Sequence, residues 1–235
     1  MLYNAVLWLS VLVYAPLAVL SFPLPALARN RFIAQWARFQ LWLLRHLCRL
    51  DYQIQGRGNL PPGPAIVFSK HQSAWETLAY QVILPPFTWV LKRELLWIPL
   101  FGWGLAMLRP IAIKRGVGHR AVDEVVKQGA DRLAAGLWVL IFPEGTRLPP
   151  RTRRKYKQGG AILAAETGYP VVPIAHNAGS FWPRRSFVKR PGVVSVAIGP
   201  VIESRGRSAA EITKLSEDWI EGTMAKLEGT SQQTG

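Results

Sequence analysis

The chain has 235 residues, of which 49% are hydrophobic and 18% charged, so its length fits one large domain and its composition excludes an intrinsically disordered chain. Lys and Arg number 29 against 14 Asp and Glu, a formal net charge of +15 that indicates an anionic partner: a phospholipid surface, a phosphorylated metabolite or a nucleic acid. The single cysteine, Cys48, excludes an intrachain disulfide framework.

The first 28 residues carry no charged side chain, and no Asp or Glu occurs before Asp51. Residues 2–21 form an apolar run that spans about 30 Å as a helix, which is just enough to cross a bilayer. Pro16, Pro23 and Pro25 weaken the interpretation as a membrane span. A cleavable signal peptide is less favoured, because no Lys or Arg precedes the run.

Residues 31–50 predict a helix with a basic stripe. Its arginines are spaced seven, seven and four apart, which places them along one side: Arg31, Arg38, Arg45 and Arg49. The other faces carry large apolar residues: Trp36, Phe39, Leu43, Leu44, Leu47 and Leu50. This pattern is typical of a helix lying in the membrane interface, and the alternative is a helix packed on the protein's own core. With residues 2–21 it predicts a hairpin dipping into one leaflet, or else one true span followed by a cytoplasmic domain.

From Asp51 onward the pattern predicts an α/β fold, a mixed sheet covered by helices. Six apolar, β-branched runs predict strands over 65–69, 88–91, 111–114, 137–142, 171–175 and 193–198. Helices are predicted over 119–135, with Gly136 as its stop, and over 208–227. The expected organisation is therefore membrane-anchoring helices over 1–50, an α/β domain over 51–228 and a frayed tail over 229–235.

Polar residues follow two of the predicted strands, at the ends where ligand sites of such sheets gather. After the first strand come His71 and, five positions on, Glu76. A carboxylate so placed can accept one imidazole N–H and leave the other nitrogen free to take a proton. No G-x-S-x-G nucleophile elbow is present, so the hydroxyl that His71 activates is expected to belong to a substrate. The alternative is a partly buried histidine with no catalytic role.

After the strand over 137–142 the chain reads Phe142-Pro143-Glu144-Gly145-Thr146-Arg147. Together the two groups resemble the glycerolipid acyltransferase family. The family's third motif, F-P-E-G-T-R, is matched fully here, and its first, N-H-x4-D, is similar to Lys70-His71-x4-Glu76. The second and fourth are matched loosely, at residues 109–115, which keep the final Arg115, and at residues 172–174. The resemblance covers roughly residues 60–178, about half the chain.

The resemblance implies a membrane-associated enzyme that needs no cofactor or metal. It would move a fatty acyl group from acyl-CoA or an acyl carrier protein to the sn-2 hydroxyl of 1-acyl-glycerol-3-phosphate, giving phosphatidic acid in phospholipid biosynthesis. His71 would be the base and Glu76 its orienter. The residues expected to bind substrate are Arg115, Glu144, Gly145, Thr146, Arg147 and Lys157. Among these, the two arginines and the backbone N–H groups around Gly145 would bind the acceptor's phosphate, and Glu144 would hold Arg147 or a glycerol hydroxyl.

Two departures from the family pattern bear on this. Glu76 is one methylene longer than the usual Asp, and Lys70 adds a charge that is expected to lower the pKa of His71. The resemblance leaves open a different lysophospholipid or lyso-aminolipid acceptor, and also an inactive basic lipid-binding homologue. The basic run 147–157 is either a solvated face or a dock for anionic lipid, coenzyme A or an acidic carrier protein. No nucleic-acid partner is expected, since it would not explain the charge-free N-terminus.

Overall fold

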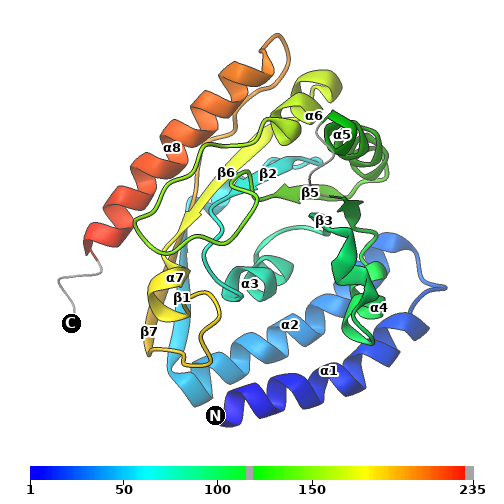
Figure 1. The fold of residues 1–235 in the computed structure, drawn as a ribbon, viewed down its shortest axis with the longest axis vertical. Helices are drawn as coiled ribbons and strands as arrows, with labels where there is room; N and C mark the ends of the chain where they lie inside the picture. The colour runs from blue at the N-terminus through cyan, green and yellow to red at the C-terminus, as the bar shows by residue number, and fades with distance from the viewer. Residues whose placement is uncertain (115–118, 231–235) are drawn as a thin grey trace.

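The computed structural model describes residues 1–114 and 119–230, and within them a seven-stranded sheet forms the centre (Figure 1). Its strands are β1 (Leu50–Gln55), β2 (Ile66–Ser69), β3 (Phe87–Lys92), β4 (Ile111–Ile113), β5 (Trp138–Ile141), β6 (Val171–His176) and β7 (Gly192–Ile198). They lie in the order β1-β7-β6-β2-β5-β3-β4. Neighbouring strands pair in parallel except β6 and β7, so the predicted mixed α/β sheet is confirmed.

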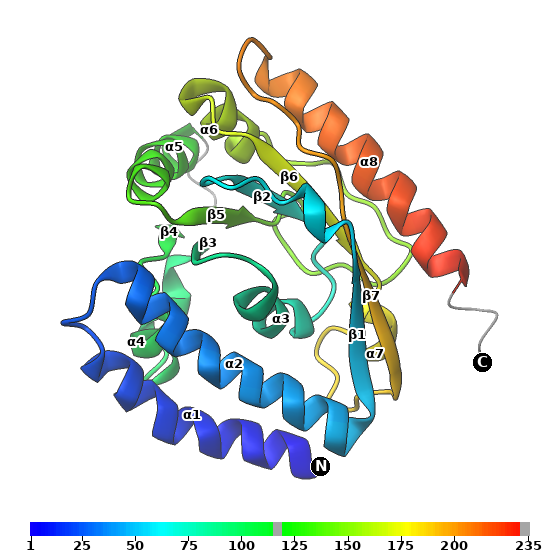
Figure 2. The same ribbon diagram turned by 180° about the vertical axis from the view of Figure 1, so that it is seen from behind.

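Alternate residues of the central strands point to two separate cores. On β2, Val67 belongs to one core, whereas Ile66 and Phe68 belong to the other. The first core is shared with α2 (Ala26–Cys48) and α3 (Trp75–Ile83), and the second with α5 (His119–Ala134), α6 (Gly159–Thr167) and α8 (Ala209–Thr230). Helices therefore cover both faces of the sheet (Figures 1 and 2). The shorter elements are η1 (Arg57–Asn59), η2 (Arg93–Trp97), α4 (Phe101–Ala106) and α7 (Ala178–Phe181).

The six predicted strands all form, and each observed boundary lies within one residue of the predicted one. The pattern did not predict β1, a half-exposed edge strand whose first residue, Leu50, was expected to end a helix. Helix α2 stops earlier because Arg49 adopts the left-handed conformation, at φ 52°. The expected division at residue 50 therefore falls inside a strand. At the other end, α8 is helical through Thr230, past the expected boundary at 228, and residues 231–235 lie outside the described chain.

The N-terminal segment forms a helical hairpin in which α1 (Leu2–Leu20) lies beside α2 and also contacts α4 (Figure 2). Pro16 lies inside α1 without ending it. Tyr3, Ala15 and Ala18 are buried against the domain, whereas the outward face exposes large apolar side chains: Leu2, Trp8, Leu9, Leu12, Val13 and Leu20. Among the described residues, α1 is the one helix that is long and apolar enough to cross a membrane.

The basic stripe of α2 is exposed, as predicted, but its apolar side is divided. Ile33 and Leu41 are buried on the domain, and so are Leu43, Leu44 and Leu50 from the predicted apolar face. Phe39, Trp42 and Leu47 remain exposed. One side of the helix therefore packs on the core, as the alternative interpretation expected, and another presents arginines and aromatic rings outward, so its placement in a membrane interface stays a prediction.

Candidate active site

His71 and Glu76 meet just beyond the carboxyl end of β2. His71 lies in the loop after the strand and Glu76 in the first turn of α3, and 2.7 Å separates the imidazole Nδ1 from the carboxylate Oε1. Glu76 is fully buried and also accepts the backbone N–H groups of Gln72 and Ser73, at 3.0 and 2.9 Å. Because an ionised carboxylate only accepts hydrogen bonds, Nδ1 donates to it and Nε2 keeps a free lone pair.

The surroundings of His71 keep its ring neutral. Its imidazole stacks on Phe142, with ring centroids 3.8 Å apart, and only 16% of the side chain is exposed. Burial lowers the pKa of His71, and the nearby Arg147 and His176 side chains add to this, against the bond to Glu76, which raises it. Burial raises the pKa of Glu76, but His176 and the bond from His71 outweigh it, so the net pKa of Glu76 is lowered. A neutral base paired with an ionised carboxylate is the state that proton abstraction requires.

A second histidine, His176 at the end of β6, lies against the same carboxylate. It is fully buried, and its Nε2 is 3.9 Å from Oε2 of Glu76 and 2.9 Å from the carbonyl oxygen of Lys70. Its Nδ1 accepts the N–H of Ala178 at 3.2 Å, so Nε2 carries the proton and donates to Lys70. Sequence reasoning missed this residue, although it directly follows the predicted strand 171–175.

Glu144 does not occupy the position expected for it. Its carboxylate is fully buried, accepts the backbone N–H of His71 at 3.0 Å, and forms an ion pair with Lys70 at 2.7 Å. The pair expected with Arg147 is not formed. Glu144 instead holds the loop after β2, which carries His71 and is called the base loop below, and it does not face a substrate. The expectation for Lys70 also needs correction, because its charge is neutralised by Glu144 and by Glu221 at 2.9 Å.

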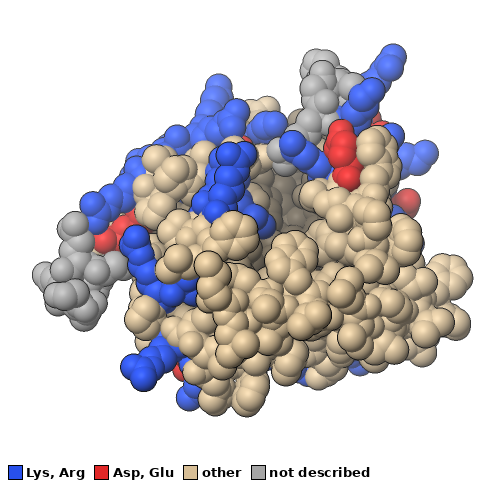
Figure 3. All heavy atoms as spheres, turned by 60° about the horizontal axis from the view of Figure 1, so that its bottom comes forward, with Lys and Arg blue, Asp and Glu red and all other residues tan. Residues whose placement is uncertain are grey.

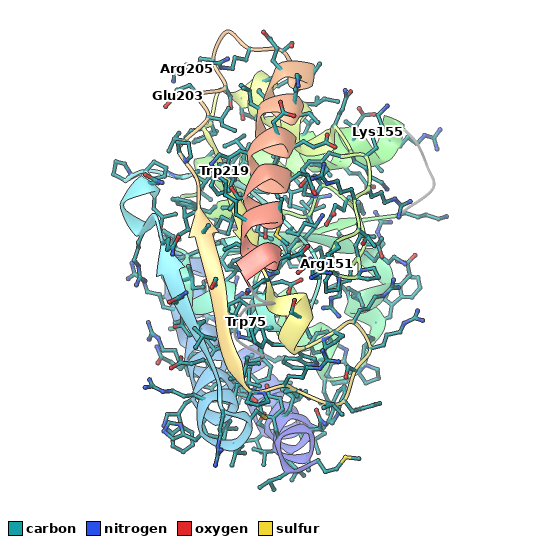
Figure 4. The ribbon with its side chains drawn as sticks, turned by 90° about the vertical axis from the view of Figure 1, so that its left-hand side faces the viewer. Trp75, Arg151, Lys155, Glu203, Arg205 and Trp219 are labelled. Carbon is teal, nitrogen blue, oxygen red and sulfur yellow. The ribbon has the colours of Figure 1, made fainter. Side chains whose placement is uncertain are left out.

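Helix α8 supplies two carboxylates that sequence reasoning did not single out, Glu221 and Glu228. Glu221 forms ion pairs with Lys70 and with the guanidinium of Arg153, the latter at 3.3 Å, and it accepts a hydrogen bond from the hydroxyl of Tyr156 at 3.1 Å. Glu228 accepts the side-chain N–H of Gln72 at 2.9 Å and the backbone N–H of Arg151 at 3.0 Å. Spaced seven apart, they share one face of α8 and hold the basic loop 147–157 along the helix, where Figure 4 labels Arg151 and Lys155.

The remaining predicted residues surround the turn after β5. Gly145 has φ +72°, and its own N–H donates to the carbonyl of Phe142 at 2.9 Å, so this N–H is not among the groups around Gly145 that are free for a phosphate. A Cβ on Gly145 would lie 3.1 Å from Cε of Lys157, so the glycine lets the lysine cross the turn. Thr146 is half-buried in the same turn. Arg115 lies outside the described residues.

Arg147 is the most informative of these side chains. Its Nε is buried, and within residues 1–114 and 119–230 it has no hydrogen-bond partner. A buried guanidinium N–H without an acceptor is costly, and a bound anion would satisfy it. In Figure 3 a hollow opens in the surface with Lys and Arg on its rim. Among the described side chains, no group of His, Cys, Asp and Glu could hold a metal ion.

Comparison with known proteins gives a consistent result. Residues 51–177 match the family described as Acyltransferase. A 1-acyl-sn-glycerol-3-phosphate acyltransferase of Pseudomonas aeruginosa is 44% identical over 99% of this chain and 92% of its own length. The human 1-acyl-sn-glycerol-3-phosphate acyltransferase alpha is 27% identical over 86% of this chain and 71% of its own. The crystal structure of the 1-acyl-sn-glycerophosphate acyltransferase PlsC from Thermotoga maritima shares the fold, with a TM-score of 0.79 at 21% identity, covering 96% of this chain and 93% of that one.

Proposed function

The chain belongs to the acyltransferase family and is an enzyme of the 1-acylglycerol-3-phosphate acyltransferase type; on this premise we propose its reaction and site. The acceptor is 1-acyl-glycerol-3-phosphate, the donor is acyl-CoA or an acyl carrier protein thioester, and the product is phosphatidic acid. The names of the relatives support the acceptor. The observation that carries the proposal is the neutral His71, oriented by Glu76, together with the buried Nε of Arg147, which has no hydrogen-bond partner among the described residues.

His71 acts as a general base in a direct transfer. Its free Nε2 takes the proton of the acceptor's hydroxyl while that oxygen attacks the thioester carbonyl. The imidazolium that forms is stabilised by Glu76 at 2.7 Å. When the carbon–sulfur bond breaks, the proton passes to the leaving thiolate, so His71 returns to its neutral state. No acyl-enzyme forms, and the products are the ester and a free thiol.

The acceptor's phosphate binds Arg147 and Lys157. A guanidinium can meet two phosphate oxygens at once, and Lys157 brings a second positive charge across Gly145 to the same turn. Glu144 and Lys70 fix the base loop from behind, as their burial at 0% and 1% exposure indicates. Arg115 follows β4, and its assignment to phosphate rests on the family motif alone.

The enzyme works at a membrane surface. The face over α1, η2 and α4 carries few charged side chains, and Lys and Arg border it in Figure 3. It exposes bulky apolar residues that water solvates poorly: Trp8, Leu9, Val13, Trp97 and Trp103. Since α1 lies along the domain, this hairpin supports insertion into one leaflet more than a free-standing span. The arginines of α2 favour the cytoplasmic face, which is the inner membrane if the source is bacterial.

Thiol release from the donor tests the reaction. The purified chain is given palmitoyl-CoA or palmitoyl-acyl carrier protein, with 1-acyl-glycerol-3-phosphate or another lysophospholipid, and mass spectrometry identifies the product. We expect acceptor-dependent thiol release and phosphatidic acid, and the loss of both in folded His71→Ala. Thiol release only with a different lysolipid would replace the acceptor. Normal turnover by His71→Ala would reject the mechanism.

A further inference from the structure

The loop between α7 and β7, residues 182–191, holds two apolar side chains out of the domain. Phe187 and Val188 are each 68% exposed, among the most exposed large hydrophobic side chains of the α/β domain. Arg184, Arg185 and Arg190 are exposed on either side of them. The loop therefore presents apolar and cationic side chains next to one another, and the reaction proposed above gives the two apolar ones no role.

Hydrogen bonds within the loop fix its conformation, and Phe187 and Val188 are exposed in that conformation. The N–H of Arg190 donates to the carbonyl of Phe181 at 2.8 Å and closes the loop at its base. The indole of Trp182 fills the interior and donates to the carbonyl of Ser186 at 3.0 Å. The fixed inner side leaves Phe187 and Val188 at the tip.

The tip is attached to the first turn of α1. The amide of Asn4 donates to the carbonyl of Phe187 at 2.9 Å, and the ammonium of Lys189 bonds to the side chain of Asn4. Lys189 also lies over the rings of Trp182 and Tyr3, at 4.2 and 4.8 Å from their centroids. Figures 1 and 2 both place this loop beside the N-terminus of α1. The exposed apolar tip therefore lies beside the first turn of α1, a helix whose outward face is apolar.

The other side of the loop reaches the active site. The carbonyl of Trp182 accepts the hydroxyl of Ser73, whose backbone N–H binds Glu76, and Arg184 donates to the carbonyl of Arg147 at 3.2 Å. One short loop thus contacts the apolar hairpin, the serine whose N–H binds Glu76, and the turn that carries Arg147.

We propose that residues 184–190 are a second membrane contact, in which Phe187 and Val188 enter the acyl region while the flanking arginines bind anionic headgroups. This inference rests on the membrane association proposed above. An apolar tip between cations matches the layering of a lipid surface, in which charge lies outside hydrocarbon. The contact would place the mouth of the active site at the depth where a lysolipid's glycerol hydroxyl lies.

A depth measurement on the full chain tests the proposal. Cys48 is the only cysteine, so in a Cys48→Ala background Val188→Cys can carry one environment-sensitive fluorophore. The matched control is Leu215→Cys on α8, which is 40% exposed and lies across the sheet from α1. Both proteins are reconstituted in phosphatidylethanolamine–phosphatidylglycerol vesicles and exposed to lipid-borne nitroxide or aqueous iodide. We expect nitroxide to quench the label at 188 severalfold more than iodide does, and the reverse at 215.

The arginines are tested by pairs of equal charge change. Arg184→Gln with Arg185→Gln should cut nitroxide quenching at 188 severalfold, whereas Arg205→Gln with Arg207→Gln should leave it unchanged, since Arg205 lies at the end of the molecule opposite to α1 in Figure 4. A chain that stays in the vesicles with an iodide-accessible label at 188 overturns the inference but not the membrane association. A chain that does not bind vesicles overturns both. A blue shift that needs no vesicles and grows with protein concentration would indicate self-association and also reject the lipid contact.

Discussion

Opposing interactions set the proton affinity of His71. Burial, Arg147 and His176 favour the neutral ring, whereas Glu76 favours the imidazolium. The net pKa of His71 lies below its ordinary 6.5, so the base stays unprotonated through the neutral range. In the proposed reaction Glu76 would also stabilise the charge that forms as His71 takes the proton. On this proposal, burial keeps the imidazole of His71 neutral before the reaction, and Glu76 stabilises the imidazolium that forms during it.

Replacing Glu76 should therefore change the pH dependence as well as the rate. Glu76→Gln removes the interaction that raises the pKa of His71, so the acid limb of kcat/KM should move to lower pH. The rate at pH 8 should fall, but by less than the roughly 10²- to 10⁴-fold expected for His71→Ala. Rates between pH 5 and 8.5 check this, with circular dichroism to confirm folding. An acid limb that stays in place or moves upward contradicts the assignment of Glu76 as orienter.

Arg147→Lys should weaken acceptor binding more than donor binding. An ammonium keeps the charge but cannot reproduce the planar guanidinium or the donor position of the buried Nε. We expect the acceptor KM to rise about tenfold, equivalent to roughly 1.4 kcal/mol, with a donor KM near that of the wild type. Steady-state kinetics with each substrate varied in turn measures both values. A change confined to the donor would place Arg147 at the thioester side.

Sequence predicted the residues whose partners are near in the chain. His71 and Glu76 are five positions apart, and the turn 142–147 is continuous, so their geometry follows from local motifs. The partners of Lys70 could not be predicted in this way, because Glu144 and Glu221 come from distant elements. The same distance explains why Glu144 was assigned to substrate: its motif gives the residue type but not the buried lysine that engages it.

Among the elements, α8 binds the loop that carries His71 through Glu221 and Glu228, although this helix lies outside the matched family range of 51–177. Lys70 is 1% exposed and forms ion pairs with carboxylates of 0% and 7% exposure. Breaking a buried pair by removing one partner leaves an uncompensated charge, which costs more than removing both. The cluster therefore couples the position of α8 to the loop that carries the base.

A double-mutant cycle on this cluster should be strongly non-additive. Lys70→Met alone removes the ion-pair partner of the buried Glu144, leaves Glu221 with only Arg153 and Tyr156, and should reduce the free energy of unfolding by about 3–5 kcal/mol. Adding Glu221→Gln should restore about 0.5–3 kcal/mol of that loss. Urea unfolding in detergent micelles measures each variant. The matched control is Lys214→Met with Asp218→Asn, an exposed pair on the same helix that should show almost no coupling. Additive effects at the buried cluster would disprove the coupling.

The elements that sequence located best are those with a continuous apolar run. The strands β2, β3, β5 and β6 are mostly buried, and their hydrophobic runs gave their places to within a residue. β1 is an edge strand with alternating exposure, which a run of apolar residues does not reveal. The division of α2 between a buried and an outward face likewise depends on where α3 and β1 pack, not on its own periodicity.

For the whole molecule, the buried histidines predict a loss of stability in mild acid. The pKa values of His71 and His176 are both lowered, chiefly by burial. The unfolded chain therefore binds more protons than the folded one near and below pH 6.5, and the free energy of unfolding falls as the pH decreases through that range. Thermal midpoints in micelles between pH 5 and 7.5 should decline toward acid. His176→Gln should flatten that decline, and an equally steep slope in this variant would contradict it.

The pairing of β1 with β7 has a consequence for how the protein is made. Leu50 is in register with Gly192, about 140 residues later. At a synthesis rate of about 5–20 residues per second, β1 waits on the order of ten seconds for β7, its strand neighbour in the described sheet. During that interval the apolar hairpin has left the ribosome while its domain is unfinished. Lipid is then the surface that can cover it, so membrane engagement during translation would precede closure of the sheet.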